Sequence, residues 1–189
     1  MAPGGGSISA YVGALGVSLG TMVANLSAHK SGWDEKWAVF SEWAEKGQKL
    51  KETLLFLVDE DTRAFNTIIE GFRLPKGSRE EIEIRKKAIE EATKYASEIP
   101  LNIMETAYDS MEIMKKMVET GLQSSLSDAA VGALCAKTAV TGAYLNVRIN
   151  VKDIKDQEFA GKILSKAKGI AEASEKMEQE IMRLVDAKI

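Results

Sequence analysis

The pattern of apolar and polar positions divides the chain into five segments with helical spacing. These segments cover residues 8–29, 33–72, 79–120, 127–151 and 157–188. Short breaks rich in Gly, Pro or Ser separate them, and Pro100 predicts a kink or a short break near Ser97. The sequence contains no strand-like alternation and no internal repeat. It therefore predicts an all-α fold, a multihelical up-and-down array of about five helices in a single domain over residues 1–189.

Two of these segments, residues 8–29 and 127–151, are apolar or small on nearly every side. Such a helix is normally central and buried, so the fourth segment is predicted to lie at the centre of the fold. The first segment has Gly16 and Gly20 four residues apart, which indicates close approach to a neighbouring helix in water rather than a membrane span. Two such helices in a short chain favour further burial in an oligomer, most simply a symmetric homodimer.

Composition and charge narrow the class of protein. The net charge of −3 and the lack of interleaved aromatic and basic residues argue against binding to nucleic acid. The single cysteine, Cys135, excludes an internal disulfide and suits a reducing compartment; its apolar neighbours indicate a small core residue. With one histidine and no HExxH or CxxC spacing, we expect no metal site. The sequence is thus that of a soluble protein, expected in the cytoplasm.

Asp61 is the residue that breaks the pattern of the second segment. Apolar residues follow a three-four spacing along this helix, and Asp61 completes their stripe between Val58 and Phe65. Burial of a carboxylate costs several kcal/mol unless partners compensate, so the chain must either pair Asp61 or raise its pKa. A raised pKa suits a general acid or base, whereas a salt bridge to another helix would make Asp61 structural. Asp59, by contrast, is expected to pair with Arg63 at the surface.

Three further groups are candidates for binding. Residues 3–7, PGGGS, precede a helix, where free amides can hold a carboxylate or phosphate, although a flexible terminus explains the glycines equally well. Asn146 and Asn150 share one helix face and either bond to other helices or bind a flat heterocycle. Ser127 and Asp128 are first of all an expected helix N-cap.

Six motifs occur together in one order. They are PGGGS (3–7), MVANLS (22–27), LVDEDTRAFN (57–66), LPKG (74–77), SDAAVGALCA (127–136) and AYLNVRIN (143–150). In this order they resemble the formiminotetrahydrofolate cyclodeaminase and methenyltetrahydrofolate cyclohydrolase family, which also forms the C-terminal part of formiminotransferase-cyclodeaminase. Members of this family usually carry one more helix before the PGGGS motif, so we expect either that the sequence is a fragment or that this member functions without that helix.

The resemblance implies an intertwined homodimer and, as substrate, a tetrahydrofolate derivative with or without a polyglutamate tail. It implies no prosthetic group. It implies ring closure of formiminotetrahydrofolate to methenyltetrahydrofolate with loss of ammonia, in histidine degradation, with a formiminotransferase as a partner. The catalytic aspartate of the V-D-x-D motif corresponds to Asp61. The residues that correspond to the folate pocket are Gly4, Gly5, Gly6, Ser7, Asn25, Ser127 and Asp128.

Two alternatives stay open on the sequence alone. The first is the methenyltetrahydrofolate cyclohydrolase reaction in the same pocket, because nothing in the sequence distinguishes a bound water from an exit for ammonia. The second is a non-catalytic helical module that binds folate or forms oligomers. In the second case Asp61 would be salt-bridged, and its removal would change stability rather than turnover.

Overall fold

The computed structural model describes residues 3–189, and in this range the protein folds into five long helices without strands. They are α1 (Gly5–Ala28), α2 (Trp37–Arg73), α3 (Arg79–Thr120), α4 (Leu126–Asn150) and α5 (Gln157–Asp186). Short 3₁₀ turns at Asp34–Lys36, Gln123–Ser125 and Val151–Asp153 join some of them. The all-α prediction and the five segments are therefore confirmed.

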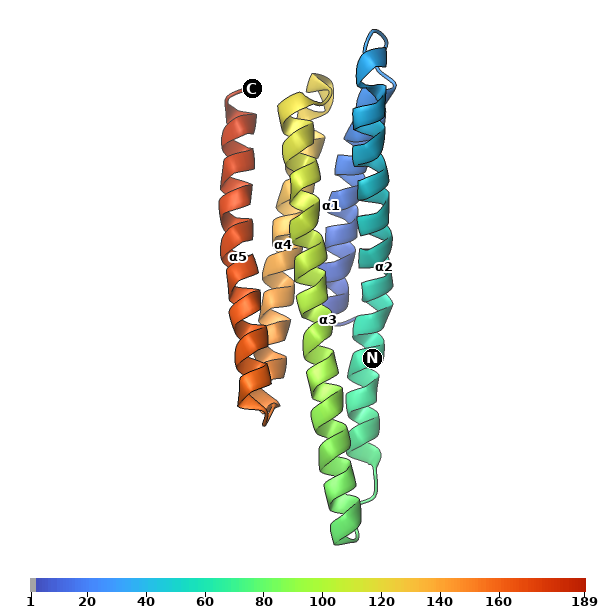
Figure 1. The fold of residues 1–189 in the computed structure, drawn as a ribbon, viewed down its shortest axis with the longest axis vertical. Coiled ribbons are helices and arrows are strands. Elements are labelled where there is room, and N and C mark those ends of the chain that lie inside the picture. Colours follow the sequence, from blue (N-terminus) through green and yellow to red (C-terminus); the bar gives the residue numbers. More distant parts are fainter. Residues whose placement is uncertain (1–2) are drawn as a thin grey trace.

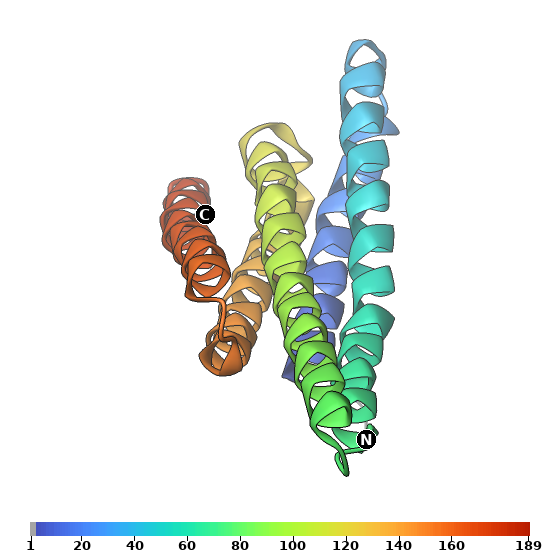
Figure 2. The ribbon, with the colours of Figure 1, turned by 60° about the horizontal axis from the view of Figure 1, so that its bottom comes forward.

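Successive helices run antiparallel, so the chain passes up and down through the molecule (Figure 1). Helices α2 and α3 extend past the N-terminus of α1 as a protruding hairpin at the bottom of this view. In the second view α5 and α2 lie at opposite edges, with α3 between them and α1 behind (Figure 2). As a result α1 begins level with the middle of α2, and the hairpin beyond that level is not covered by α1.

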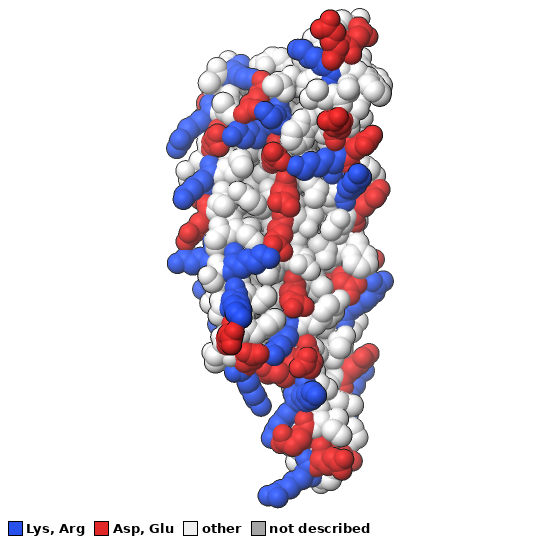
Figure 3. Space-filling model, viewed as in Figure 1, with Lys and Arg blue, Asp and Glu red and all other residues white. Residues whose placement is uncertain are grey.

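The core is built around the second half of α3. Its methionine and isoleucine side chains pack against α1, α2, α4 and α5, and those with no exposed surface include Ile103, Met104, Met111, Ile113 and Met114. Ion pairs cover the outer side of this helix, among them Lys46–Glu112 and Lys115–Glu180. Figure 3 shows this face, where acidic and basic side chains alternate over α3 and its neighbours.

Helix α4 does not occupy the centre of the fold, contrary to the sequence prediction. It packs against α1, α3 and α5 but leaves one side open, where Leu145 is 51% exposed and Ile149 63% exposed. Helix α1 is open on one side as well, as Ile8 (47% exposed) and Leu15 (47% exposed) show. A helix that is apolar all round needs cover on every side, and one copy of the chain supplies only part of it.

Close packing of α1 explains its small residues. A Cβ on Gly16 would lie 2.7 Å from the carbonyl oxygen of Gly132 and 2.9 Å from the Cβ of Cys135, so α1 and α4 touch through their backbones. By length and composition α1 could cross a membrane, but 61% of its most apolar window is buried in the molecule. The glycines therefore let α1 approach a neighbouring helix closely, as predicted. Cys135, predicted as a core residue, lies half-buried at this contact.

Three local predictions need correction. Ser127 does not cap α4, because the helix begins at Leu126 and its N-cap, Ser125, makes no side-chain hydrogen bond. Helix α3 continues without a break through Pro100. The partner of Arg63 is Glu60 rather than Asp59, since position i−3 brings the carboxylate to 2.9 Å from the guanidinium.

Candidate functional site

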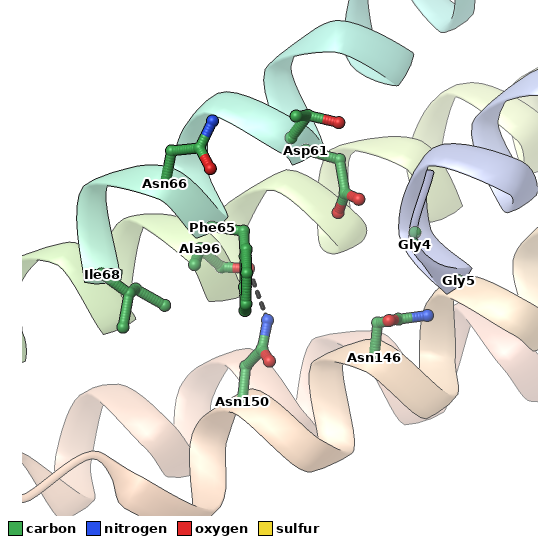
Figure 4. A pocket seen from close by; sticks show the side chains of 11 residues that line it. Gly4, Gly5, Asp61, Phe65, Asn66, Ile68, Ala96, Asn146 and Asn150 are labelled. Atoms are coloured by element: carbon green, nitrogen blue, oxygen red, sulfur yellow. Dashed lines mark hydrogen bonds between the residues drawn. The ribbon is translucent and has the colours of Figure 1, made fainter. Parts of the chain in front are cut away.

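A cavity of about 460 Å³ opens where the N-terminus of α1, the middle of α2 and the C-terminal end of α4 meet (Figure 4). Its size is that of sites for small organic ligands. It exists because the first residues of α1 are glycines without side chains. In addition, α1 begins at this level, whereas α2 and α3 extend beyond it. The lining residues are Gly4, Gly5, Gly6, Asp61, Thr62, Phe65, Asn66, Ile68, Ala96, Asn146 and Asn150.

Asp61 is held at this cavity by the first turn of α1. Both the backbone N–H and the hydroxyl of Ser7 donate to its Oδ2, each at 2.8 Å. The N–H groups of a first helical turn have no partners within the helix, and the helix dipole favours a negative group beside them. The Asp61 carboxylate, which belongs to α2, thus caps the N-terminus of α1. Within residues 3–189, no donor bonds to Oδ1, the second oxygen.

The expected burial of Asp61 in an apolar stripe was wrong. Asp61 is half-buried, and Phe65, one turn further along α2, is 53% exposed and lines the cavity. The expected alternative, a salt bridge to another helix, is absent from the described part of the chain, where Ser7 supplies the partners instead. Within the segment expected to hold an anion, residues 3–7, one amide, that of Ser7, binds the carboxylate of the protein itself.

Asn146 and Asn150 both line the cavity, and each also bonds to backbone. The Nδ2 of Asn150 donates to the carbonyl oxygen of Ala96 in α3 at 2.7 Å (Figure 4). The Nδ2 of Asn146 donates to the carbonyl oxygen of Gly142 in its own helix at 2.9 Å. Each amide group therefore turns its nitrogen to the protein and keeps its oxygen free of protein donors. The structural interpretation is confirmed for Asn150, which bonds to another helix, and the binding interpretation of the pair stays a prediction.

Three of the predicted pocket residues lie elsewhere. Asn25 is exposed near the C-terminal end of α1, where its Nδ2 donates to the carbonyl oxygen of Thr21. Ser127 and Asp128 lie in the first turn of α4, beside the same end of α1. At 1.5 Å per residue, α1 separates Asn25 from Gly5 by roughly 30 Å. One copy of the chain does not bring these residues to the cavity.

Next to the cavity, Glu60 links α2 to α3. The hydroxyl of Tyr95 and the guanidinium of Arg63 both donate to its carboxylate. These two hydrogen bonds, that of Tyr95 first, lower the pKa of Glu60, and the same bond raises the pKa of Tyr95. The pair fixes the position of α3 beside Asp61.

The lining residues that were not predicted from the sequence are Thr62, Phe65, Asn66, Ile68 and Ala96. For Phe65 and Ile68 the signal was available, because positions four and seven after Asp61 lie on the same helix face. Thr62 and Asn66 lie roughly 100° and 140° round the helix from Asp61, so the spacing gave no signal for them. Ala96 carried no signal of its own, since its contribution is a backbone carbonyl. In the described residues no three His, Cys, Asp or Glu side chains converge as they would at a metal site.

Comparison with known proteins shows which family this chain belongs to. Residues 1–169 match the family model described as formiminotransferase-cyclodeaminase. A methenyltetrahydrofolate cyclohydrolase from Methylorubrum extorquens is 32% identical over 99% of this chain and 90% of its own length. A formimidoyltransferase-cyclodeaminase from Mus musculus is 36% identical over 85% of this chain. The chain spans about 30% of that longer relative.

The fold agrees with these relationships. The crystal structure of a formiminotetrahydrofolate cyclodeaminase from Thermotoga maritima superposes with a TM-score of 0.86, covering 98% of this chain and 88% of the other, at 24% identity. Together with the match over residues 1–169, this all-helical architecture defines the class of protein. The chain belongs to the formiminotransferase-cyclodeaminase family, as the ordered motifs predicted.

Proposed function

We propose that this protein is a folate one-carbon enzyme that closes formiminotetrahydrofolate to methenyltetrahydrofolate and releases ammonia. The observation that carries this proposal is the Asp61 carboxylate at the cavity wall, with Oδ2 fixed by Ser7 and Oδ1 free of protein donors. A carboxylate held by one oxygen has a defined direction for proton transfer through the other.

The reaction needs one proton removed and one delivered. The side-arm nitrogen of the folate attacks the carbon of the protonated formimino group, and a C–N bond forms while the attacking nitrogen loses its proton to Oδ1 of Asp61. The former formimino nitrogen, now an NH2 group on a tetrahedral carbon, takes this proton as its own C–N bond breaks, and it leaves as ammonia. The apolar sides of Phe65 and Ile68 limit the access of water to the product.

The test of this role is Asp61→Asn, which keeps the shape of the side chain and an acceptor for Ser7 but removes the base. We expect turnover to fall by at least about 100-fold, the usual size of a general acid–base contribution, with folate binding largely retained. Asp59→Asn is the matched control, because Asp59 is exposed on the same helix. Near-wild-type turnover of Asp61→Asn, followed by the near-ultraviolet absorbance of methenyltetrahydrofolate, would contradict the proposal.

A second candidate is the cyclohydrolase reaction in the same cavity. It is supported by the Methylorubrum extorquens relative, which bears this name and matches this chain over nearly its whole length. Here Oδ1 of Asp61 takes a proton from a water molecule that adds to the methenyl carbon. It returns this proton to one of the two folate nitrogens as the C–N bond to that nitrogen breaks, and the new hydroxyl releases its proton to solvent as the formyl group forms. The purified protein, offered each substrate separately, distinguishes the two reactions by the direction of the absorbance change. A non-catalytic module would turn over neither substrate, and the enzyme names of the relatives argue against it.

We further propose that a second copy of the chain covers the apolar face of α1 and α4. Exposed apolar residues follow the whole length of both helices, namely Ile8, Tyr11, Leu15, Met22 and Leu26 on α1 and Val131, Leu134, Leu145 and Ile149 on α4. Residues 5–28 carry no acidic or basic side chain, and Lys137 of α4 is turned to Glu175 of α5. A patch of this kind on a soluble protein marks an interface.

An antiparallel two-fold pairing would also complete the site. It sets the C-terminal end of α1 from one copy over the N-terminal end of α1 in the other, because a two-fold axis perpendicular to α1 brings opposite ends together. Asn25, Ser127 and Asp128 of the second copy would then lie beside the cavity that holds Asp61. The substrate would contact both copies, and a separate formiminotransferase would supply it.

Two measurements test this pairing. Leu15→Lys in the middle of the face should give a monomer in sedimentation and lose activity, whereas Leu164→Lys on α5, 38% exposed outside the face, should leave the dimer intact. Mixing Asp61→Asn with Asp128→Ala should restore about a quarter of wild-type activity, because half of the dimers then carry one intact site. A fully active monomer, or no recovery on mixing, would overturn the shared site.

A further inference from the structure

The carbonyl oxygen of Ala96 faces the cavity without a partner from its own helix. In an α-helix this oxygen accepts from the N–H four residues later, which is position 100. Pro100 has no N–H, so α3 cannot supply this hydrogen bond. A buried carbonyl without a partner is costly, and Asn150 of α4 donates to it at 2.7 Å.

This bond fixes which way the Asn150 amide faces. The Ala96 carbonyl can only accept, so the nitrogen arm must point to it and the oxygen arm must point away. Figure 4 shows the oxygen of Asn150 on the side of Asn146, above the floor of the cavity. Asn146 is fixed in the same manner, since its nitrogen donates to the carbonyl of Gly142. The α4 side of the cavity therefore presents two acceptors one helical turn apart.

Two acceptors beside an exposed aromatic ring suit a flat ligand with N–H donors on one edge. The Phe65 ring is 53% exposed and lines the same cavity. A reduced pteridine carries its 2-amino group and ring N–H groups on one edge, so its donors match these oxygens. If the nitrogen of Asn150 faced the ligand instead, donor would meet donor, and a buried unpaired group weakens binding.

We infer that Pro100 is a positioning residue for the substrate. By withholding an N–H from the Ala96 carbonyl, it commits the Asn150 nitrogen to that carbonyl and the Asn150 oxygen to the pteridine edge. This inference rests on the proposed function for the identity of the ligand. The structural part, the dependence of the Asn150 orientation on Pro100, stands on the protein alone.

The test restores the missing N–H. Pro100→Ala, and the larger Pro100→Val if the alanine leaves too much space, give α3 its own donor for Ala96 and free the Asn150 amide to rotate. We expect KM to rise roughly 10-fold, as for the loss of one ordered hydrogen bond, while kcat changes much less. Pro75→Ala is the control, because Pro75 lies in the exposed loop before α3. Its KM should equal that of the wild type.

A double-mutant comparison with Asn150 distinguishes a positioning role of Pro100 from general damage to α3. In an Asn150→Ala background, which has no amide to misplace, Pro100→Ala should add no further rise in KM. Asn150→Asp sets an oxygen against the Ala96 carbonyl beside Pro100, so it should be better tolerated together with Pro100→Ala. An unchanged KM in Pro100→Ala, or equal effects in both backgrounds, would overturn the inference.

A readout without substrate distinguishes this inference from the proposed function. The side-chain amide signal of Asn150 in a ¹⁵N–¹H spectrum reports its bond to Ala96, and it should shift in Pro100→Ala but not in Pro75→Ala. If the signal shifts while the wild-type protein turns over neither folate, Pro100 does orient the Asn150 amide but the proposed function is wrong. If turnover is normal and the signal does not move, the function holds and the inference fails.

Discussion

The two ends of the α1 and α4 pair carry similar polar residues, yet only one end forms a cavity. At the N-terminal end of α1, Asp61 from α2 and the Ala96 carbonyl from α3 meet Ser7 and Asn150. At the opposite end the Ser27 hydroxyl is already taken by the N–H of Leu122, and helix and turn pack directly together.

The difference lies in what the backbone leaves free. The first turn of α1 has unpaired N–H groups, Pro100 leaves a carbonyl unpaired, and three glycines leave space beside both. At the far end the N–H groups of Gly121, Leu122 and Ser125 find partners nearby, Ser27 is buried, and Asn25 and Ser127 face outward. Within a single copy of the chain, polar residues therefore form a site only at one end. There the helices differ in extent and leave a gap lined with backbone groups that lack helical partners. The predictions that follow test this contrast.

The largest expected effect is at Gly6, where a side chain would overlap the Asp61 carboxylate. A Cβ there would lie within 2.6 Å of Cγ of Asp61, which would have to leave its bonds with Ser7. We expect Gly6→Ala to fold but to lose at least about 100-fold in kcat, because the base is displaced. Gly169→Ala on α5, with no atom within 4 Å of the new Cβ, is the control and should keep full activity. A rate close to wild type in Gly6→Ala would show that Asp61 need not be held there.

A smaller effect is expected in the middle of α1, at Gly16. Its Cβ would lie 2.7 Å from the Gly132 carbonyl oxygen, and this backbone cannot yield as a side chain can. We expect Gly16→Ala to lower the free energy of unfolding by about 1–2 kcal/mol, the cost of overpacking less the gain in helix propensity. In thermal denaturation, Gly169→Ala should instead be about 0.5–1 kcal/mol more stable than wild type. A stabilised Gly16→Ala would mean that the two helices can move apart freely.

Ser7→Ala should have a more modest effect on catalysis. It removes the hydroxyl donor to Asp61 Oδ2 but leaves the backbone N–H of the same residue in place. The loss of one charge-assisted hydrogen bond predicts a fall in kcat/KM of roughly 10-fold. Ser18→Ala, whose hydroxyl bonds only within α1, should not change kcat/KM. If Ser7→Ala lost as much activity as Asp61→Asn, the backbone N–H of residue 7 would not be sufficient to hold the carboxylate.

The smallest effect concerns pH and the contact of α2 with α3. The pKa of Glu60 is lowered from 4.5 by Tyr95 and Arg63, so the folded state binds its proton less readily than the unfolded state. This contribution to stability is present above pH 4.5 and is lost as the pH falls through the lowered pKa. Tyr95→Phe should therefore lose stability less steeply in acid than the wild type, measured by urea unfolding from pH 3 to 6. Tyr144→Phe should keep the wild-type slope.

Much of the fold and part of the site were predictable from the sequence. Ser78 caps α3 with a capping box from Glu81, a purely local pattern, and the helical segments agree with the structure to within a few residues. Asp61 was found because a charge interrupts an apolar spacing. The burial of α4 was predicted wrongly, because the helix periodicity shows which sides are apolar but not which neighbour covers them.

The sequence alone thus determined the five helices, the close approach of α1 to a neighbouring helix through glycine and the choice of Asp61 as the candidate catalytic residue, since each depends on local spacing or on the size of a side chain. Only the tertiary structure decided that Ser7 rather than a cation holds this carboxylate. Only it paired Asn150 with the carbonyl that Pro100 leaves free, and only it put Asn25 and Asp128 far from Asp61. These outcomes depend on where one helix ends relative to another, a quantity that no local pattern encodes.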